Sequence, residues 1–214
     1  MLLDESGTAG TENVDVSPLF CADDADITIR SLGAYEFCVH KLILSLASPI
    51  FKDMFTVPQP PADNPGVLPH VDVEESAVTW RHILLTIYPT PNPVIDDLED
   101  LESLLFTAKK YEMQSIIDTH KMTFENHGFM RENPLRLYAI ACACGFEDQA
   151  KYVAKHAELL AVTRDFDAGN PRGLTLGSYH NLVSFLAERD YEWNRIFGEA
   201  ELPQSYRCDC DPSL

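Results

Sequence analysis

Two cysteine pairs are the first candidates for chemistry, because thiolates bind soft metals and act as nucleophiles. Cys142 and Cys144 are separated by one residue, as are Cys208 and Cys210, whereas zinc sites typically separate their cysteines by two. On a helix, side chains two positions apart point in nearly opposite directions, so Cys142 and Cys144 cannot hold one ion together. We expect this pair to pack as small apolar residues. For Cys208 and Cys210, an incidental terminal pair is favoured over a soft-metal site.

The other residue types that could support catalysis form no recognisable motif. The seven histidines lack H-E-x-x-H spacing, and the chain has no G-x-S-x-G, P-loop or G-x-G-x-x-G sequence. Adjacent acids such as Asp96–Asp97 and Glu74–Glu75 fit the solvated start of a helix. We therefore expect a protein that is not an enzyme, without catalytic residues, metal or cofactor. The remote alternative is an enzyme or metal protein that uses the C-terminal helical half.

The charge balance argues against several partners. Lys and Arg number 16 against 34 Asp and Glu, a net charge of −18, and such a surface repels the phosphates of nucleic acids. Acids also dominate residues 1–26, which predicts a disordered acidic arm over residues 1–19. No apolar run approaches the roughly 20 residues that span a bilayer. We expect no direct nucleic-acid or membrane binding, and an intracellular protein of nucleus or cytoplasm.

The elements expected in the first half mix strands with short helices. Residues 27–31 and 35–39 read as a hairpin, and residues 71–73 as a third strand. Ser48 followed by Pro49 predicts that one helix ends and another begins there. Apolar spacing predicts three more helices, one starting at Glu74 or Glu75, one over residues 101–108 and one over residues 113–124.

The second half reads as helical throughout. Asn133 and Pro134 predict a helix start, and Gly145 a stop. Helices are also expected over residues 146–156 and 178–189, with a loop over residues 165–173. Strands followed by helices, without alternation, predict an α+β fold.

Several motifs at fixed offsets resemble the BTB/POZ family. They are Asp26 at the first strand, His40-Lys41, Leu44-x-x-x-Ser48 and Phe51-x-x-Met54-Phe55. Ile87-Tyr88 and the stretch Ala108-Lys109-Lys110-Tyr111 are similar to two later helices of the family, although Pro89 stands where Thr or Ser is usual. The resemblance covers about residues 20–125. It implies a BTB/POZ fold, a small mainly three-stranded sheet flanked by short helices. Residues 126–214 would be an all-helical extension of unknown role, as in a fungal branch of the family.

The resemblance implies a protein–protein interaction module, a scaffold or adaptor that forms homodimers. One reading is a substrate adaptor that binds the cullin scaffold of a ubiquitin ligase; the alternative is a transcription-associated scaffold that recruits corepressors. Cullin-binding members usually carry a hydrophobic-x-Glu motif where this chain has Val57-Pro58-Gln59, preceded by the apolar Phe55. Glutamine retains only part of the hydrogen bonding of the missing acid.

Two groups of residues are candidate interaction sites with an open alternative. Asp26 and Lys41 match a charged pocket at the dimer interface of transcriptional members, or else Asp26 caps local backbone and Lys41 extends along the surface. Leu42, Ile43 and Leu46 are either a dimer surface or core residues, and their helical spacing favours the core.

Overall fold

The computed structural model describes residues 20, 22–57, 68–125, 127–169 and 171–197. The expected acidic arm, Gln59 and the pair Cys208 and Cys210 lie outside these residues. The chain divides into two compact units, residues 1–121 and residues 122–214.

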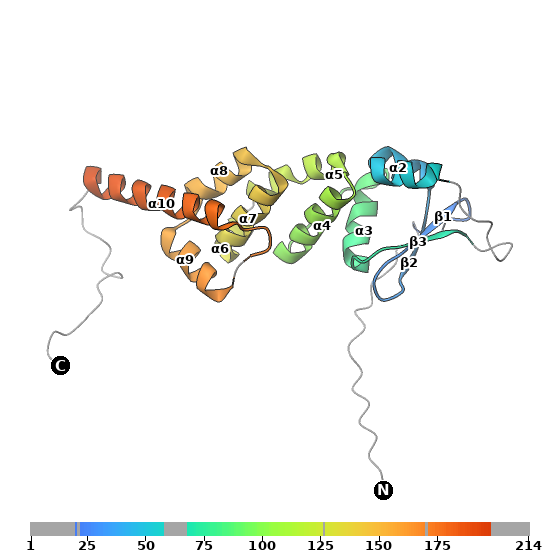
Figure 1. The fold of residues 1–214 in the computed structure, drawn as a ribbon, viewed down its shortest axis with the longest axis horizontal. Helices are drawn as coiled ribbons and strands as arrows, with labels where there is room; N and C mark the ends of the chain where they lie inside the picture. The colour runs from blue at the N-terminus through green and yellow to red at the C-terminus, as the bar shows by residue number, and fades with distance from the viewer. Residues whose placement is uncertain (1–19, 21, 58–67, 126, 170, 198–214) are drawn as a thin grey trace, which may run out of the picture. The chain divides into compact units, whose positions relative to one another are not determined.

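The first unit contains a three-stranded sheet with the order β2-β1-β3. Its strands are β1 (Ile27–Arg30), β2 (Glu36–Val39) and β3 (His70–Asp72), which lie together in Figure 1. The predicted hairpin is confirmed, because β1 and β2 pair antiparallel around a turn in which Gly33 and Ala34 adopt φ angles of 84° and 62°. β3 pairs with β1 in parallel and begins one residue before the predicted strand.

Arg30 of β1 contacts an acidic side chain on each neighbouring strand. It lies opposite Glu36 of β2 and Asp72 of β3. Its guanidinium contacts Glu36 Oε1 at 3.0 Å and Asp72 Oδ1 at 3.4 Å. These pairs are solvent-exposed and add little stability, but a slip of either neighbour by one residue would separate them.

Five short α-helices complete the described part of the first unit. They are α1 (Lys41–Ala47), α2 (Pro49–Thr56), α3 (Ala77–Ile87), α4 (Leu98–Lys110) and α5 (Gln114–Thr119). The first packs against the second and the third, and the last three pack against one another.

The predicted boundary at Ser48 and Pro49 is confirmed. Ser48 has extended backbone geometry, and its hydroxyl accepts a hydrogen bond of 3.1 Å from the amide of Phe51. Pro49 is the first residue of α2, where its missing amide proton costs nothing.

Two predicted helix boundaries are wrong. α3 begins at Ala77 rather than at Glu74 or Glu75, because Ser76 Oγ caps it by accepting from the amide of Thr79 at 3.1 Å. The helix expected over residues 113–124 is interrupted at His120, whose backbone leaves helical geometry. The chain continues there as a 3₁₀ helix, Lys121–Glu125.

Buried aromatic rings form the centre of the first unit. The ring of Phe51 stacks on that of Tyr111 at 5.0 Å between centroids and meets Trp80 edge-on at 5.8 Å. Phe51 and Trp80 are fully buried. The carboxylate of Glu75 accepts hydrogen bonds from Trp80 Nε1 at 3.4 Å and from the Tyr111 hydroxyl at 3.3 Å, which satisfies the polar ends of both rings.

The second unit is helical in the residues that the structure describes. Its helices are α6 (His127–Glu132), α7 (Pro134–Cys144), α8 (Glu147–His156), α9 (Leu159–Ala168) and α10 (Leu176–Phe197). The predicted ends of α7 are confirmed. Asn133 Oδ1 accepts from the amide of Arg136 at 2.7 Å, and Gly145 stops the helix with a φ of 75°.

The loop predicted over residues 165–173 begins too early, because its first four residues belong to a helix. α9 continues to Ala168, and Gly169 ends it with a φ of 153°. The ring of Phe166 stacks on that of Tyr179 in α10, with centroids 4.1 Å apart. This contact between helices holds the last turn of α9, and local sequence pattern does not reveal it.

Arg189 fastens α10 to the C-terminal end of α8. Its guanidinium donates to the carbonyl oxygens of Ala157, Lys155 and Ala154 at 2.9, 3.1 and 3.4 Å. A cation at this end also complements the helix dipole. Within the described residues, none of the helices is long and apolar enough to cross a membrane.

Candidate functional site

Two leucines of α1 face solvent. Leu42 is 69% exposed and Leu46 is 81% exposed, and their spacing of four places them on one side of the helix. The preference for a core position is therefore wrong for both, because Leu44 is the α1 residue that is fully buried. Ile43 is half-buried. We call Leu42 and Leu46 the α1 face.

Asp26 and Lys41 are brought together through the backbone. The Asp26 carboxylate accepts a hydrogen bond of 2.7 Å from the amide of Lys41, the first residue of α1. Because His40 makes no side-chain cap, Asp26 supplies an acceptor that this helix start otherwise lacks. The Lys41 ammonium lies over the ring of Phe55, 5.9 Å from its centroid.

Tyr88 also positions the start of α1, a role that sequence reasoning did not assign. Its hydroxyl accepts from the amide of His40 at 3.0 Å and lies 2.9 Å from His40 Nδ1. The other ring nitrogen of His40 lies 3.3 Å from an Asp24 carboxylate oxygen. Burial raises the pKa of Tyr88, so its hydroxyl stays protonated. In the sequence, Tyr88 stands out only as part of a motif that resembles the BTB/POZ family, and that motif does not indicate a contact with His40.

The end of α2 presents the remaining predicted residues. Phe55 is half-buried and packs on Phe51 at 5.9 Å between ring centroids. Val57, the residue after α2, is 58% exposed. Gln59 lies outside the described residues, so its position relative to Val57 stays a prediction.

Side chains that bind metals do not gather in the described residues. No group of three or more His, Cys, Asp or Glu side chains there could hold an ion. Cys142 and Cys144 form no disulfide in the part of the chain that the structure describes. Both are partly buried on α7, and burial raises the pKa of Cys142.

Two histidines of the first unit are buried side by side in sequence-distant elements. His82 of α3 is 7% exposed and His120 is 4% exposed. His120 Nε2 lies 3.4 Å from Thr86 Oγ1, whereas His82 Nδ1 is buried without a hydrogen-bond partner in the described structure. Burial lowers the pKa of both rings, which favours their neutral forms.

Comparison with known proteins decides the family. The sequence model of the BTB/POZ domain matches residues 17–127, just over half of the chain. The chain belongs to the BTB/POZ family. The predicted fold is confirmed, since the small three-stranded sheet and short helices of the BTB fold precede further helices. As a BTB/POZ protein, it is a protein–protein interaction module.

One solved structure with similarity to this BTB chain is described as the BTB domain of zebrafish PATZ1. The sequences are 24% identical over 47% of this chain and 75% of that chain, with a TM-score of 0.38. A comparison with curated proteins gave no match.

Proposed function

We propose that this BTB protein is a homodimeric scaffold and that the α1 face forms the contact between its two copies. The observation that carries the proposal is the exposure of Leu42 and Leu46 on a single face. Exposed apolar side chains that cluster are typical of interaction surfaces. The net charge of −18 makes two copies repel each other, so an apolar contact is the type of surface on which they can associate.

Light scattering coupled to size exclusion tests this proposal on the full chain. The wild type should form a dimer, and Leu42→Asp should shift it to a monomer at the same concentration. Leu32→Asp is the matched control, because Leu32 is 67% exposed in the β1–β2 turn, away from α1. A wild type that stays monomeric over a concentration series, or equal loss of dimer in both variants, would contradict the proposal.

A second candidate function is that of a cullin adaptor, and the end of α2 supports it. Val57 is exposed there and Phe55 is half-buried beside it, which supplies the apolar part of the hydrophobic-x-Glu motif. Because Gln59 is neutral, we expect weaker binding than an acidic residue would give.

A pull-down with a purified cullin N-terminal domain tests the adaptor role. Val57→Asp should abolish capture, and Gln59→Glu should increase it. If the wild type and Gln59→Glu both fail to bind, the adaptor role is excluded. A dimer that fails to bind cullin would favour the corepressor-recruiting scaffold.

A further inference from the structure

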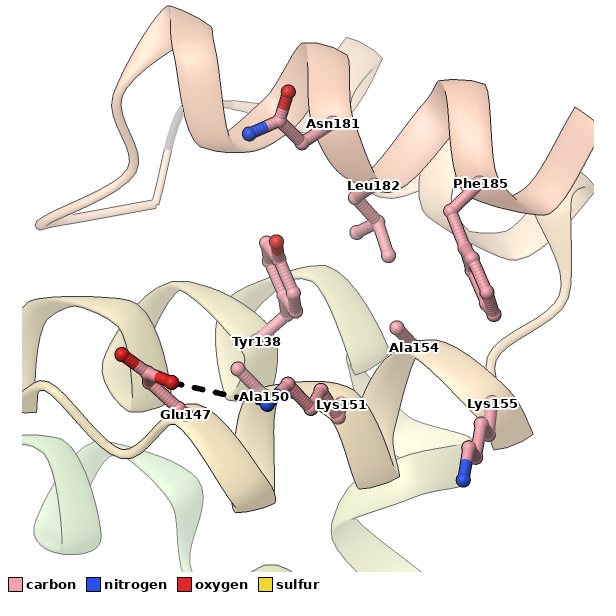
Figure 2. Close-up of a pocket in the computed structure, with 9 residues that line it drawn as sticks. All are labelled: Tyr138, Glu147, Ala150, Lys151, Ala154, Lys155, Asn181, Leu182 and Phe185. Carbon is pink, nitrogen blue, oxygen red and sulfur yellow. Dashed lines mark ion pairs between the residues drawn. The ribbon is translucent and has the colours of Figure 1, made fainter.

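A cavity of about 340 Å³ lies in the second unit between α7, α8 and α10. Figure 2 shows Leu182 and Phe185 of α10 pointing toward α8, where Ala150 and Ala154 line the opposite wall. The ring of Tyr138 from α7 lies between these walls. The volume is at the small end of the roughly 300–1,000 Å³ of ordinary ligand pockets, so the cavity suits a compact molecule.

The middle of this cavity is apolar. Ala150 and Ala154 are one helical turn apart, and their small side chains leave room that larger ones would fill. Leu182 is buried opposite them, and Phe185 keeps 41% of its surface exposed. The Tyr138 hydroxyl carries no charge at neutral pH, because burial raises its pKa to about 12. These side chains favour the apolar part of a ligand.

The two ends of the cavity differ in charge. At one end, Glu147 and Lys151 form an ion pair of 3.7 Å, so their charges offset each other. At the other end, Lys155 borders the cavity and makes no ion pair within the part of the chain that the structure describes. Figure 2 shows both ends, with Lys155 at the right below Phe185 and Glu147 at the left.

Arg189 holds the Lys155 end of the cavity in place. Its guanidinium donates to the carbonyl oxygens of Lys155 and Ala157 at 3.1 and 2.9 Å. The same guanidinium contacts the carboxylate of Asp190 at 2.9 Å, which offsets its charge. Of the two lysines that line the cavity, Lys155 is therefore the one available to an anion. Its flexible stem lets the ammonium group turn toward a ligand at this end.

We infer that this cavity is a binding site for a small molecule with an apolar ring body and one carboxylate. The body lies between the two alanines of α8 and the apolar side chains of α10, and the carboxylate pairs with Lys155. Apolar contact supplies most of the affinity, and the charge pair selects the anion over a neutral molecule of the same shape. The inference concerns the second unit and does not depend on dimerisation through the α1 face.

An NMR titration of the full chain tests the inference, with isotope-labelled alanine methyl groups as reporters. The probe is naphthoate, and naphthamide is the matched neutral molecule. The methyl resonances of Ala150 and Ala154 should shift as naphthoate is added, because its ring lies against them. That of Ala187, which is exposed on α10 and does not line the cavity, should not shift. Naphthamide should bind about two- to fivefold more weakly, as expected for one exposed charge pair.

Substitutions on the wall and at the charged end locate the probe. Ala150→Leu and Ala154→Leu each fill the cavity and should abolish binding, whereas Ala187→Leu adds the same volume outside it and should leave binding unchanged. Lys155→Gln should lower the affinity for naphthoate to that for naphthamide. Lys52→Gln, at an exposed lysine of α2, should retain the preference for the anion. Thermal unfolding shows which variants are folded, and Ala150→Leu serves if Ala154→Leu is not.

Three results would overturn the inference. Alanine methyl resonances that stay in place with both probes would show that the cavity binds neither. Equal affinity for naphthoate and naphthamide, unchanged by Lys155→Gln, would exclude a carboxylate as the recognised group. Naphthoate binding that survives in folded Ala150→Leu and Ala154→Leu would place the probe outside the cavity.

Discussion

The hydroxyl of Ser48 donates a hydrogen bond of 2.6 Å to the backbone carbonyl of Tyr111. The same oxygen accepts from the amide of Phe51, so one buried side chain caps α2 and ties it to the end of α4. Ser48 is fully buried, and no water replaces a lost partner at such a position.

Replacement of this hydroxyl should therefore be costly. Ser48→Ala removes a helix cap and leaves the Tyr111 carbonyl without this partner, so we expect the free energy of unfolding to fall by about 1–3 kcal/mol. Urea denaturation measures the change. Ser45→Ala, within α1, should stay within about 0.5 kcal/mol of the wild type. Equal destabilisation by both variants would contradict the dual role of Ser48.

Removal of the Asp26 carboxylate should loosen the start of α1. Asp26→Ala deletes the acceptor for the Lys41 amide and should lower the free energy of unfolding by about 0.5–2 kcal/mol. Asp26→Asn retains an oxygen acceptor and should lose less. Thermal unfolding compares these variants with Asp23→Ala, a change at an exposed acid nearby. The capping role fails if Asp23→Ala is as harmful as Asp26→Ala.

The buried histidines predict a loss of stability in acid. Burial lowers the pKa of His82 and His120 below the ordinary value of 6.5, so the unfolded chain binds protons that the folded chain rejects. For His82, Asp100 opposes the effect of burial and Arg81 adds to it. The free energy of unfolding should therefore fall as pH decreases through 6.5 and below.

Urea midpoints at several pH values between 8 and 5 measure this dependence, with those limits chosen as roughly the range in which histidine titrates. The double variant His82→Gln with His120→Gln should have a flatter pH dependence than the wild type. His180→Gln, at an exposed position, should retain the wild-type slope. Identical slopes for all three proteins would exclude the buried rings as the cause.

Two glycines of the second unit should respond to alanine in opposite directions. Gly145 has a φ of 75°, and a methyl group there meets no atom within 4 Å, so Gly145→Ala suffers backbone strain alone, about 1 kcal/mol. Gly177 lies in α10, where a new methyl group would be 3.9 Å from Thr175 Oγ1. Gly177→Ala should therefore stabilise the helix, by up to about 1 kcal/mol. Calorimetric melting temperatures should move down for the first and up for the second.

The helix boundaries that the sequence predicts correctly are those set by capping residues next to them in the chain. Ser48 before Pro49, Asn133 before Pro134 and Gly145 after α7 act on backbone groups within a few residues, so their effects appear in the sequence itself. His120 interrupts a helix although the apolar spacing continues through it, and its ring contacts Thr86, a residue distant in sequence.

The candidate site was less predictable than the fold. Leu42 and Leu46 follow the same spacing as core residues, and only the position of α1 in the folded unit shows that they face solvent. Asp26 is a candidate only because of the family resemblance. In the structure its carboxylate accepts a hydrogen bond from the backbone amide of Lys41, and the residue types alone do not predict such a contact.

The parallel pairing of β1 with β3 has a consequence for synthesis. β1 is the central strand, and its second neighbour begins at His70, after two helices and a proline-rich stretch have been made. A chain emerging from the ribosome can form the β1–β2 hairpin early, but an isolated hairpin is only marginally stable. The sheet is completed only when residue 72 has emerged, so the nascent chain exposes one edge of β1 until then.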